Sequence, residues 1–532
     1  MFRKVPSAWH GSMAQPSMRH SKPIPPKTAI SLAPVVATAC AMAAMAAQPA
    51  GAARAANTAG PPNSAQPDTA AHSATATQSI RVRVQTGLLV GTLDNAVESF
   101  KGVPYATPPV GALRWKLPRP AAAWSGERAA DDFGPSCTQG SAPRNVPPTS
   151  RGAQVSEDCL TLNVWAPQSA RRAPVMVWIH GGGNDAGSSA VVYYDGTAFA
   201  RDGVVLVSLN YRLGQLGFEP HNGAANFGLW DQVAALGWVR DNIASFGGDP
   251  ANVTLFGESA GGEDTLALMT AVPARGLFQK AIVESGGGGW GPPPTAAHAA
   301  ASHDEGAEQD TYYGPTVDGH LLKEPPLTAI AAGRAVHIPL IIGTNGEEGS
   351  LLGPDARTEG LFPKLSKDDQ ARLAQLYGPL ASNDSTLARL EFRDGHFASE
   401  ARWIATKVSA TGAPAYLYRF EYVLGVLQAR RTGAFHGSEI PFVFDRLPTQ
   451  RLDDNDLRVT RALHGCWTAF ARTGKPTCAD APDWSPFGEG GKWMVFDSHP
   501  AARAPEGAAA LDLLQCRLAE APLSAQASCP AK

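Results

Sequence analysis

The stretch "TLFGESAGGEDTL", residues 254–266, places a serine between two glycines at a spacing of two on each side. The preceding "NVTLFG" (252–257) is typical of a buried strand, and a helix is expected from about Gly262. G-x-S-x-G between a strand and a helix is typical of a nucleophile elbow, a sharp turn in which a Cβ beside the serine would collide with the backbone. The sequence therefore predicts Ser259 as a nucleophile; the alternative is a structural Gly-Ser turn.

A second glycine run supplies candidate donors for an oxyanion. "VMVWIHGGG" (175–183) ends an apolar, strand-like run in three glycines, where backbone N–H groups can approach a substrate closely. We expect the amides of Gly182, Gly183 and Ala260 to form the oxyanion hole. The glycines at 286–289 serve as a comparison: no buried strand is evident before them, and an ordinary loop is expected.

Strand-like and helix-like runs alternate along the rest of the chain. The strand-like runs include "GVVLVSLNYR" (203–212), "HIPLIIGTN" (337–345) and "AYLYRFEYV" (415–423), and the helix-like runs include residues 228–248 and 456–473. This order indicates an α/β fold with a mostly parallel, twisted central sheet and helices on both faces. Because no second linker or repeat interrupts it, residues 79–525 are expected to form a single domain.

Composition excludes several classes of partner. The 532 residues are 44% hydrophobic and 17% charged, with a formal net charge of -3. No Lys/Arg cluster is present, so neither nucleic acid nor an anionic membrane is indicated as a partner. The cysteine spacing fits no zinc-binding pattern, and no H-E-x-x-H motif is present.

The first 78 residues differ from the remainder. Basic residues precede the apolar run 29–47, and small residues follow it, which is the layout of a signal peptide over residues 1–50. A membrane anchor is the alternative. Residues 51–78 have the composition of a disordered linker. We expect export to the periplasm or medium, with cleavage around residues 46–56. Cys40 falls in this leader, and the six cysteines that remain are an even number, which makes disulfides plausible.

Several long motifs carry a family resemblance over essentially all of residues 80–500. They are "FKGVPYATPPVGALRW" (100–115), "SEDCLTLNVWAP" (156–167), "NYRLGQLGF" (210–218), "FGGDPANVTLFGESAGG" (246–262) and "FHGSEIPFVF" (435–444). With them the chain resembles the type-B carboxylesterases of the α/β-hydrolase superfamily, which include bacterial para-nitrobenzyl-type esterases and the cholinesterases. The resemblance implies a serine carboxylic-ester hydrolase that forms an acyl-enzyme on a small-molecule ester. It implies no cofactor or metal, and no obligatory protein partner is evident.

The fold's chain order of serine, acid and histidine guides the choice of the other two groups. His436 lies in a loop beyond the strand-like run 415–423 and matches the family's HG-x-E motif, whereas His464 lies inside a helix-like run as a packed or surface residue. "LIIGTNGEEGS" offers Glu347 and Glu348. The family's acid stands directly before Gly-Ser, which selects Glu348 and leaves Glu347 as an exposed neighbour.

The resemblance also assigns supporting residues. Glu258 and Ser285 match positions of a hydrogen-bond network behind the family's catalytic residues; ordinary polar pairing in the core is the alternative. Cys137 and Cys159 match the family's early disulfide, and the other four cysteines have no pairing implied.

Three departures from the family pattern separate this chain from its relatives. Asn184-Asp185 stands where an aromatic residue often follows the glycines, Glu263-Asp264 replaces smaller residues after the elbow, and residues 286–314 are a short Gly/Pro/Ala-rich segment. Acids suit a helix N-terminus. Loss of bulk beside the glycines and a shorter wall predict an open site for small, water-soluble esters.

The same triad could instead serve a lactone, carbamate, amide or toxin ester. A non-catalytic adhesion or scaffold relative is disfavoured because Ser259, Glu348 and His436 are all present.

Overall fold

The computed structural model describes residues 78–141, 145–287, 313–362, 364–448, 450–488 and 491–518. The predicted leader and nearly all of the predicted linker lie outside the described residues, as do residues 288–312 of the short segment. The first strand begins at Gln78, one residue before the expected start of the domain.

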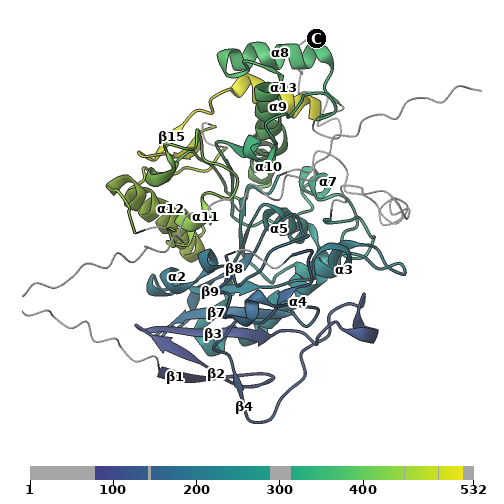
Figure 1. The fold of residues 1–532 in the computed structure, drawn as a ribbon, viewed down its shortest axis with the longest axis vertical. Helices are drawn as coiled ribbons and strands as arrows, with labels where there is room; N and C mark the ends of the chain where they lie inside the picture. The colour runs from purple at the N-terminus through teal and green to yellow at the C-terminus, as the bar shows by residue number, and fades with distance from the viewer. Residues whose placement is uncertain are drawn as a thin grey trace, which may run out of the picture. The chain divides into compact units, whose positions relative to one another are not determined.

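Thirteen strands of the described part of the chain form one sheet, and β5 with β6 forms a separate pair (Figure 1). The strands are β1 (Gln78–Val84), β2 (Gly87–Asp94), β3 (Val97–Pro104), β4 (Glu127–Ala129), β5 (Ser136–Cys137), β6 (Val155–Ser156), β7 (Thr161–Pro167), β8 (Ala173–Ile179), β9 (Val205–Leu209), β10 (Gly248–Glu258), β11 (Lys280–Glu284), β12 (Leu340–Asn345), β13 (Ala415–Phe420), β14 (Trp493–Phe496) and β15 (Ala501–Arg503).

The α-helices lie between these strands and after them. They are α2 (Thr197–Arg201), α3 (Gly214–Phe218), α4 (Phe227–Asn242), α5 (Ala260–Thr270), α7 (Pro326–Ala331), α8 (Lys367–Tyr377), α9 (Asp384–Phe392), α10 (Ser399–Ala410), α11 (Ile440–Val443), α12 (Asp454–Thr473) and α13 (Ala508–Leu518).

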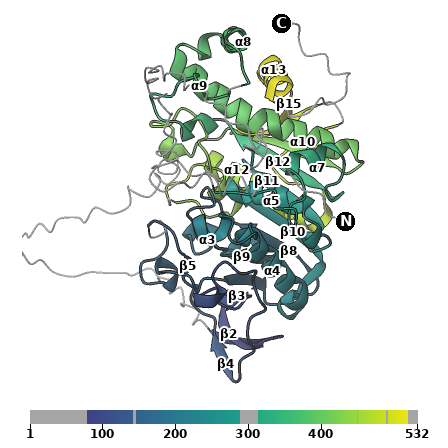
Figure 2. The same cartoon turned by 90° about the vertical axis from the view of Figure 1, so that its right-hand side faces the viewer.

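The centre of the sheet is parallel and its two ends are antiparallel. The order is β1-β2-β3-β7-β9-β8-β10-β11-β12-β13-β14-β15, with β4 beside β2. Along this order, pairing is parallel from β9 to β14 and antiparallel from β1 to β9 and between β14 and β15. The short strand β4 pairs with β2 in parallel. Figure 2 shows β2, β3 and β4 at one end of the sheet, away from β11 and β12. The expected mostly parallel α/β fold is confirmed.

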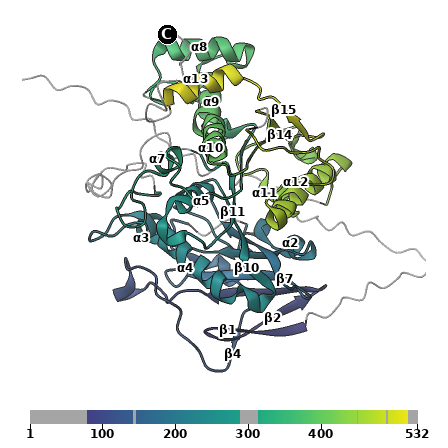
Figure 3. The ribbon, with the colours of Figure 1, turned by 180° about the vertical axis from the view of Figure 1, so that it is seen from behind.

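Alternate residues of the central strands enter two different cores. Val175, Val177 and Ile179 of β8 pack into one hydrophobic cluster, and Met176 and Trp178 pack into the other. Helices α4 and α5 contact β10 and contribute to the first cluster, whereas α2 and α12 contribute to the second (Figures 1 and 3). Strands buried on both faces explain why their sequences are continuous apolar runs.

Sequence-predicted elements agree with these bounds, with differences at their ends. The helix expected over 228–248 is α4 to Asn242 and then a 3₁₀ turn (Ile243–Phe246), and α5 starts at Ala260 rather than near Gly262. The expectation that no buried strand precedes the glycines at 286–289 is wrong. Strand β11 is completely buried there; Lys280 and Glu284, a charged residue at each end, conceal it in the sequence.

Two disulfides have both partners within the described residues. Cys137 bonds to Cys159, and Cys466 bonds to Cys478. Cys516 is also disulfide-bonded. In the described ranges, no helix has the length and apolar character needed to cross a bilayer.

Candidate active site

Ser259 occupies a strained turn between β10 and α5. Its backbone has φ 55° and ψ -127°, a conformation that L-residues rarely adopt. A Cβ added to Gly257 would lie 2.5 Å from the carbonyl of Gly261, and one added to Gly261 would lie 2.2 Å from the oxygen of Ile179. The elbow therefore requires glycine at both positions, as the sequence predicted.

Glu348 and His436 meet although they follow different strands. Glu348 begins a 3₁₀ turn just beyond β12, and His436 lies in the loop between β13 and α11. Nδ1 of His436 lies 2.6 Å from Oε2 of Glu348, and both side chains are buried. Three contacts fix the two loops together: the Glu347 amide donates to the Ala434 oxygen at 2.8 Å, the Asn345 side chain donates to the Phe435 oxygen at 2.9 Å, and the His436 amide donates to the Ser350 hydroxyl at 3.2 Å.

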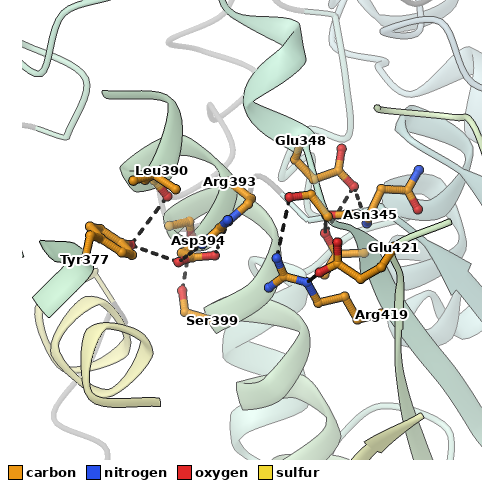
Figure 4. A network of polar contacts seen from close by, with 12 residues as sticks. Asn345, Glu348, Tyr377, Leu390, Arg393, Asp394, Ser399, Arg419 and Glu421 are labelled. Carbon is orange, nitrogen blue, oxygen red and sulfur yellow. Dashed lines mark hydrogen bonds and ion pairs between the residues drawn. The ribbon is translucent and has the colours of Figure 1, made fainter. Parts of the chain in front are cut away.

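The second carboxylate oxygen of Glu348 is also occupied. Oε1 accepts hydrogen bonds from the Ser285 hydroxyl at 2.6 Å, the Asn345 amide at 2.8 Å and the Thr344 hydroxyl at 3.0 Å. Figure 4 shows Glu348 beside Asn345, next to the Arg419–Glu421 pair. Burial alone would raise the pKa of Glu348, but His436 and these hydrogen bonds outweigh it and leave the pKa lowered. Glu348 is therefore a buried carboxylate that stays ionised.

The other ring nitrogen of His436 faces Glu258. Nε2 lies 3.2 Å from Oε1 of this residue, which directly precedes Ser259. Burial raises the pKa of Glu258. Burial also lowers the pKa of His436, but Glu258 and Glu348 raise it by more, so that the net pKa is raised. Among the described residues, the Ser259 hydroxyl makes no hydrogen bond; alignment of such groups commonly tightens only when substrate binds.

The glycine loop after β8 lies directly against the elbow. A Cβ on Gly181 would lie 2.9 Å from that of Ser259. Gly182 and Gly183 have φ of 114° and 64°, which favour glycine. Within the described part of the chain, the amides of Gly182, Gly183 and Ala260 donate to no protein acceptor. These three N–H groups therefore remain available to a ligand.

Two carboxylates beside this site were not singled out from the sequence. Glu439 is buried three residues after His436, and its Oε2 accepts a hydrogen bond from Asn345. Glu284 is buried at the end of β11, where its Oε1 accepts from Trp467 at 2.7 Å. Burial raises the pKa of both. Glu439 is the acid of the HG-x-E motif, so that motif was a signal for it; Glu284 had none, because only the sheet order brings β11 beside β10.

Two sequence-based expectations change, those for Glu347 and Asn184. Glu347 is not simply exposed: its side chain is 31% accessible and pairs with Arg389 at 3.0 Å. Asn184 does not open space beside the loop, because its side chain is completely buried against Asp264 and Tyr211. Asp264 is likewise buried, within α5. His464 is a packed residue whose Nδ1 contacts the Val443 oxygen at 2.7 Å.

Comparison with known proteins agrees with the fold. Residues 78–289 and 295–510 match the profile of the carboxylesterase family. Para-nitrobenzyl esterase of Bacillus subtilis (strain 168) is 36% identical over 461 residues, covering 77% of this chain and 92% of its own. Fumonisin B1 esterase of Sphingopyxis macrogoltabida is 34% identical over 475 residues, covering 78% and 86% respectively.

The solved structure of a Geobacillus stearothermophilus carboxylesterase superposes with a TM-score of 0.70 at 31% identity, covering 81% of this chain and 99% of that one. An α/β-hydrolase fold with a strained strand-to-helix turn at Ser259 thus defines the class of protein. The chain belongs to the carboxylesterase family, and its activity is that of a carboxylesterase.

Proposed function

We propose that this protein hydrolyses carboxylic esters through an acyl-enzyme formed on Ser259, with His436 as base and Glu348 as the acid of the triad. The observation that carries the proposal is the 2.6 Å contact between His436 and the ionised, buried Glu348, beside the elbow that presents Ser259. A carboxylate in this place holds the imidazole in one tautomer and stabilises its protonated form.

The reaction then follows from these positions. His436 removes the hydroxyl proton of Ser259 as the oxygen attacks the ester carbonyl. The amides of Gly182, Gly183 and Ala260 donate to the oxyanion that develops. His436 protonates the leaving alcohol, and a water molecule attacks the acyl-enzyme in the same way to release the acid.

Glu258 and Ser285 support the triad from behind. Ser285 donates to Glu348 at 2.6 Å and thereby helps to orient its carboxylate. Glu258 lies 3.2 Å from the Nε2 of His436, where its ionised form favours the imidazolium that forms during the reaction. To receive the Ser259 proton, Nε2 has to exchange this contact for the hydroxyl.

Small, water-soluble esters are the proposed substrates. The ring centroid of Phe397 lies 5.6 Å from that of His436, so one bulky aromatic side chain borders the base. The segment 286–314 is also short in the sequence, which supports small esters as substrates. The similarity to a fumonisin B1 esterase favours a toxin ester as the second candidate, and lactones, carbamates and amides use the same groups.

We also propose that residues 79–525 act as one catalytic domain that is exported after cleavage around residues 46–56. The disulfides Cys137–Cys159 and Cys466–Cys478 are compatible with an oxidising compartment. N-terminal sequencing of exported protein tests the cleavage, and a retained residue 29–47 segment in the membrane fraction would favour an anchor.

The decisive experiment is on Ser259. A fluorophosphonate probe should label the parent enzyme at this residue, and Ser259→Ala should lower kcat by roughly 10⁴- to 10⁶-fold, as in other triads. Labelling at a different serine, or a fully active variant, would refute the assignment.

A further inference from the structure

The two departures at Asn184 and Asp264 form a single contact in the structure. Asn184 follows the glycine loop, and Asp264 lies in α5, the helix that begins at Ala260. Nδ2 of Asn184 donates to Oδ1 of Asp264 at 3.2 Å, and both residues are 0% exposed. The hydrogen bond between these two buried groups, which lie 80 residues apart in sequence, replaces hydrogen bonds to water that both groups lose on folding.

A third buried side chain extends the contact to α4. Nε2 of Gln232 donates to Oδ2 of Asp264 at 2.5 Å, and Gln232 is also 0% exposed. The three residues Asn184, Asp264 and Gln232 are called the polar bridge below. Through it the glycine loop is tied to the elbow helix, and the elbow helix is tied to its neighbour.

Asn184 is also held on its other side. Its Oδ1 lies 3.1 Å from the Tyr211 hydroxyl, which also donates to the His180 oxygen at 2.8 Å, and its backbone oxygen accepts from the Gly214 amide at 2.6 Å. Its φ of 56° lies in the left-handed region, which asparagine tolerates better than most residues. Both ends of the side-chain amide therefore contact buried polar groups.

The charge state of Asp264 matters for the choice of variants. Burial raises the pKa of this carboxyl well above its usual value, and the neighbouring Glu263 raises it further against the lowering by the hydrogen bonds from Gln232 and Asn184. Burial therefore favours the protonated form of this carboxyl more than in an ordinary aspartic acid. Asparagine is its near-isostere and keeps an acceptor, whereas leucine fills similar space without one.

We propose that the polar bridge positions the oxyanion hole, with Asn184 and Asp264 as positioning residues that hold the amides of the glycine loop in register with the amide of Ala260. The inference rests on the proposed function of Ser259. The candidate donors belong to two separate elements, and each must lie about 2.7–3.1 Å from one developing oxyanion. Misplacement by about 1 Å can cost roughly 10²-fold in rate, and the Asn184–Asp264 hydrogen bond links these two elements directly.

The test compares three variants of the full enzyme with a matched control. Asn184→Gly removes the amide and keeps the positive φ accessible, Asp264→Leu removes the acceptor, and Asp264→Asn keeps it. Asn242→Ala is the control, because it removes a buried side chain that bonds the Gln85 amide and the Trp238 oxygen at 2.8 and 2.9 Å, near the far end of α4. The readouts are kcat, KM and the Ki of a trifluoromethyl ketone, whose adduct with the active serine carries an oxyanion.

We expect Asn184→Gly and Asp264→Leu to lower kcat roughly 10- to 100-fold with KM changed less than about threefold, somewhat less than loss of a whole donor. The Ki of the ketone should weaken by the same factor as kcat/KM, and Asp264→Asn should recover most of the loss. The double variant should be no worse than the poorer single one, because both changes break one contact. Asn242→Ala should leave the Ki unchanged.

Four results would overturn the inference. The first two are folded bridge variants that bind the ketone as tightly as the parent, and a fall in kcat without a change in the Ki of the ketone. The other two are multiplicative effects on kcat in the double variant, and an equal weakening of ketone binding by Asn242→Ala. Should Asp264→Leu fail to fold by circular dichroism, Asn184→Gly and the control decide the question. A parent enzyme that is not labelled at Ser259 would refute the proposed function and the bridge together, whereas a labelled parent with unaffected variants would refute the bridge alone.

Discussion

The Nδ1 atom of His436 lies 2.6 Å from Oε2 of Glu348, although 88 positions separate the two residues in sequence. The contact is possible because β12 and β13 are adjacent parallel strands, so that the loops after them leave the same edge of the sheet. Ser259 follows β10 and the glycine loop follows β8 at that same edge. One topological feature therefore gathers all four segments of the site.

Glu348, rather than its neighbour Glu347, should control the rate. Glu348→Gln should lower kcat by about 10⁴-fold, because the amide no longer selects the reactive tautomer of His436. Glu347→Gln should cost less than about tenfold, since Glu347 pairs with Arg389 and has no contact with the base. Steady-state kinetics with p-nitrophenyl acetate decide the matter, and the opposite ranking would refute the assignment of the acid.

Glu258 should set the acid limb of the pH profile. As a carboxylate beside Nε2 it raises the pKa of His436, and the base is active only when neutral. Glu258→Gln removes this negative charge, so the pKa of His436 should fall and activity should persist to lower pH, by about one pH unit in kcat/KM. Glu347→Gln serves as the control and should leave the limb in place. An unchanged or upward-shifted limb in Glu258→Gln would contradict the prediction.

Acyl-chain preference should lie at the short end. Each buried methylene contributes about 0.8 kcal/mol only where a wall is present to cover it. With a short segment at 286–314, kcat/KM for p-nitrophenyl esters should peak at about two to six acyl carbons by this reasoning, and emulsified triglyceride should give no jump in activity. A steady increase through long acyl chains would show that other residues rebuild the wall.

The Cys137–Cys159 bond should contribute measurably to stability. It joins residues 22 apart, and closing a loop of that size is worth about 3 kcal/mol in the chain-entropy model. Replacing both cysteines with alanine should lower the free energy of unfolding in urea by about that amount. Peptide mapping without reductant confirms the pairing in the parent, and a loss below about 1 kcal/mol would show that the bond does not constrain the unfolded chain as the model assumes.

The sequence by itself determined the features that are local. The turn at Ser259 could be predicted from a strand-like run, five residues with two glycines, and a helix-like run. Such a sharp turn constrains only the residues next to it in the chain. The alternation of strands and helices could also be predicted from local sequence, because burial on both faces gives each central strand a continuous apolar run. Strand β11 was missed, because the charged residues at its ends interrupt that signal.

Only the tertiary structure decided which distant side chains meet. The family resemblance assigned Glu258 to a network behind the catalytic residues, but only the structure places it 3.2 Å from His436. Only the structure buries Asn184 against Asp264, and the sequence-based interpretation of Asn184 as a source of open space was wrong. A polar side chain on a loop takes its orientation from the hydrogen-bond partners that packing brings to it, and a buried amide without partners costs about 1–3 kcal/mol. Those partners lie on helix α5 and beyond strand β9, so strand order and helix packing, rather than neighbouring residues in the chain, determine where the side chain points.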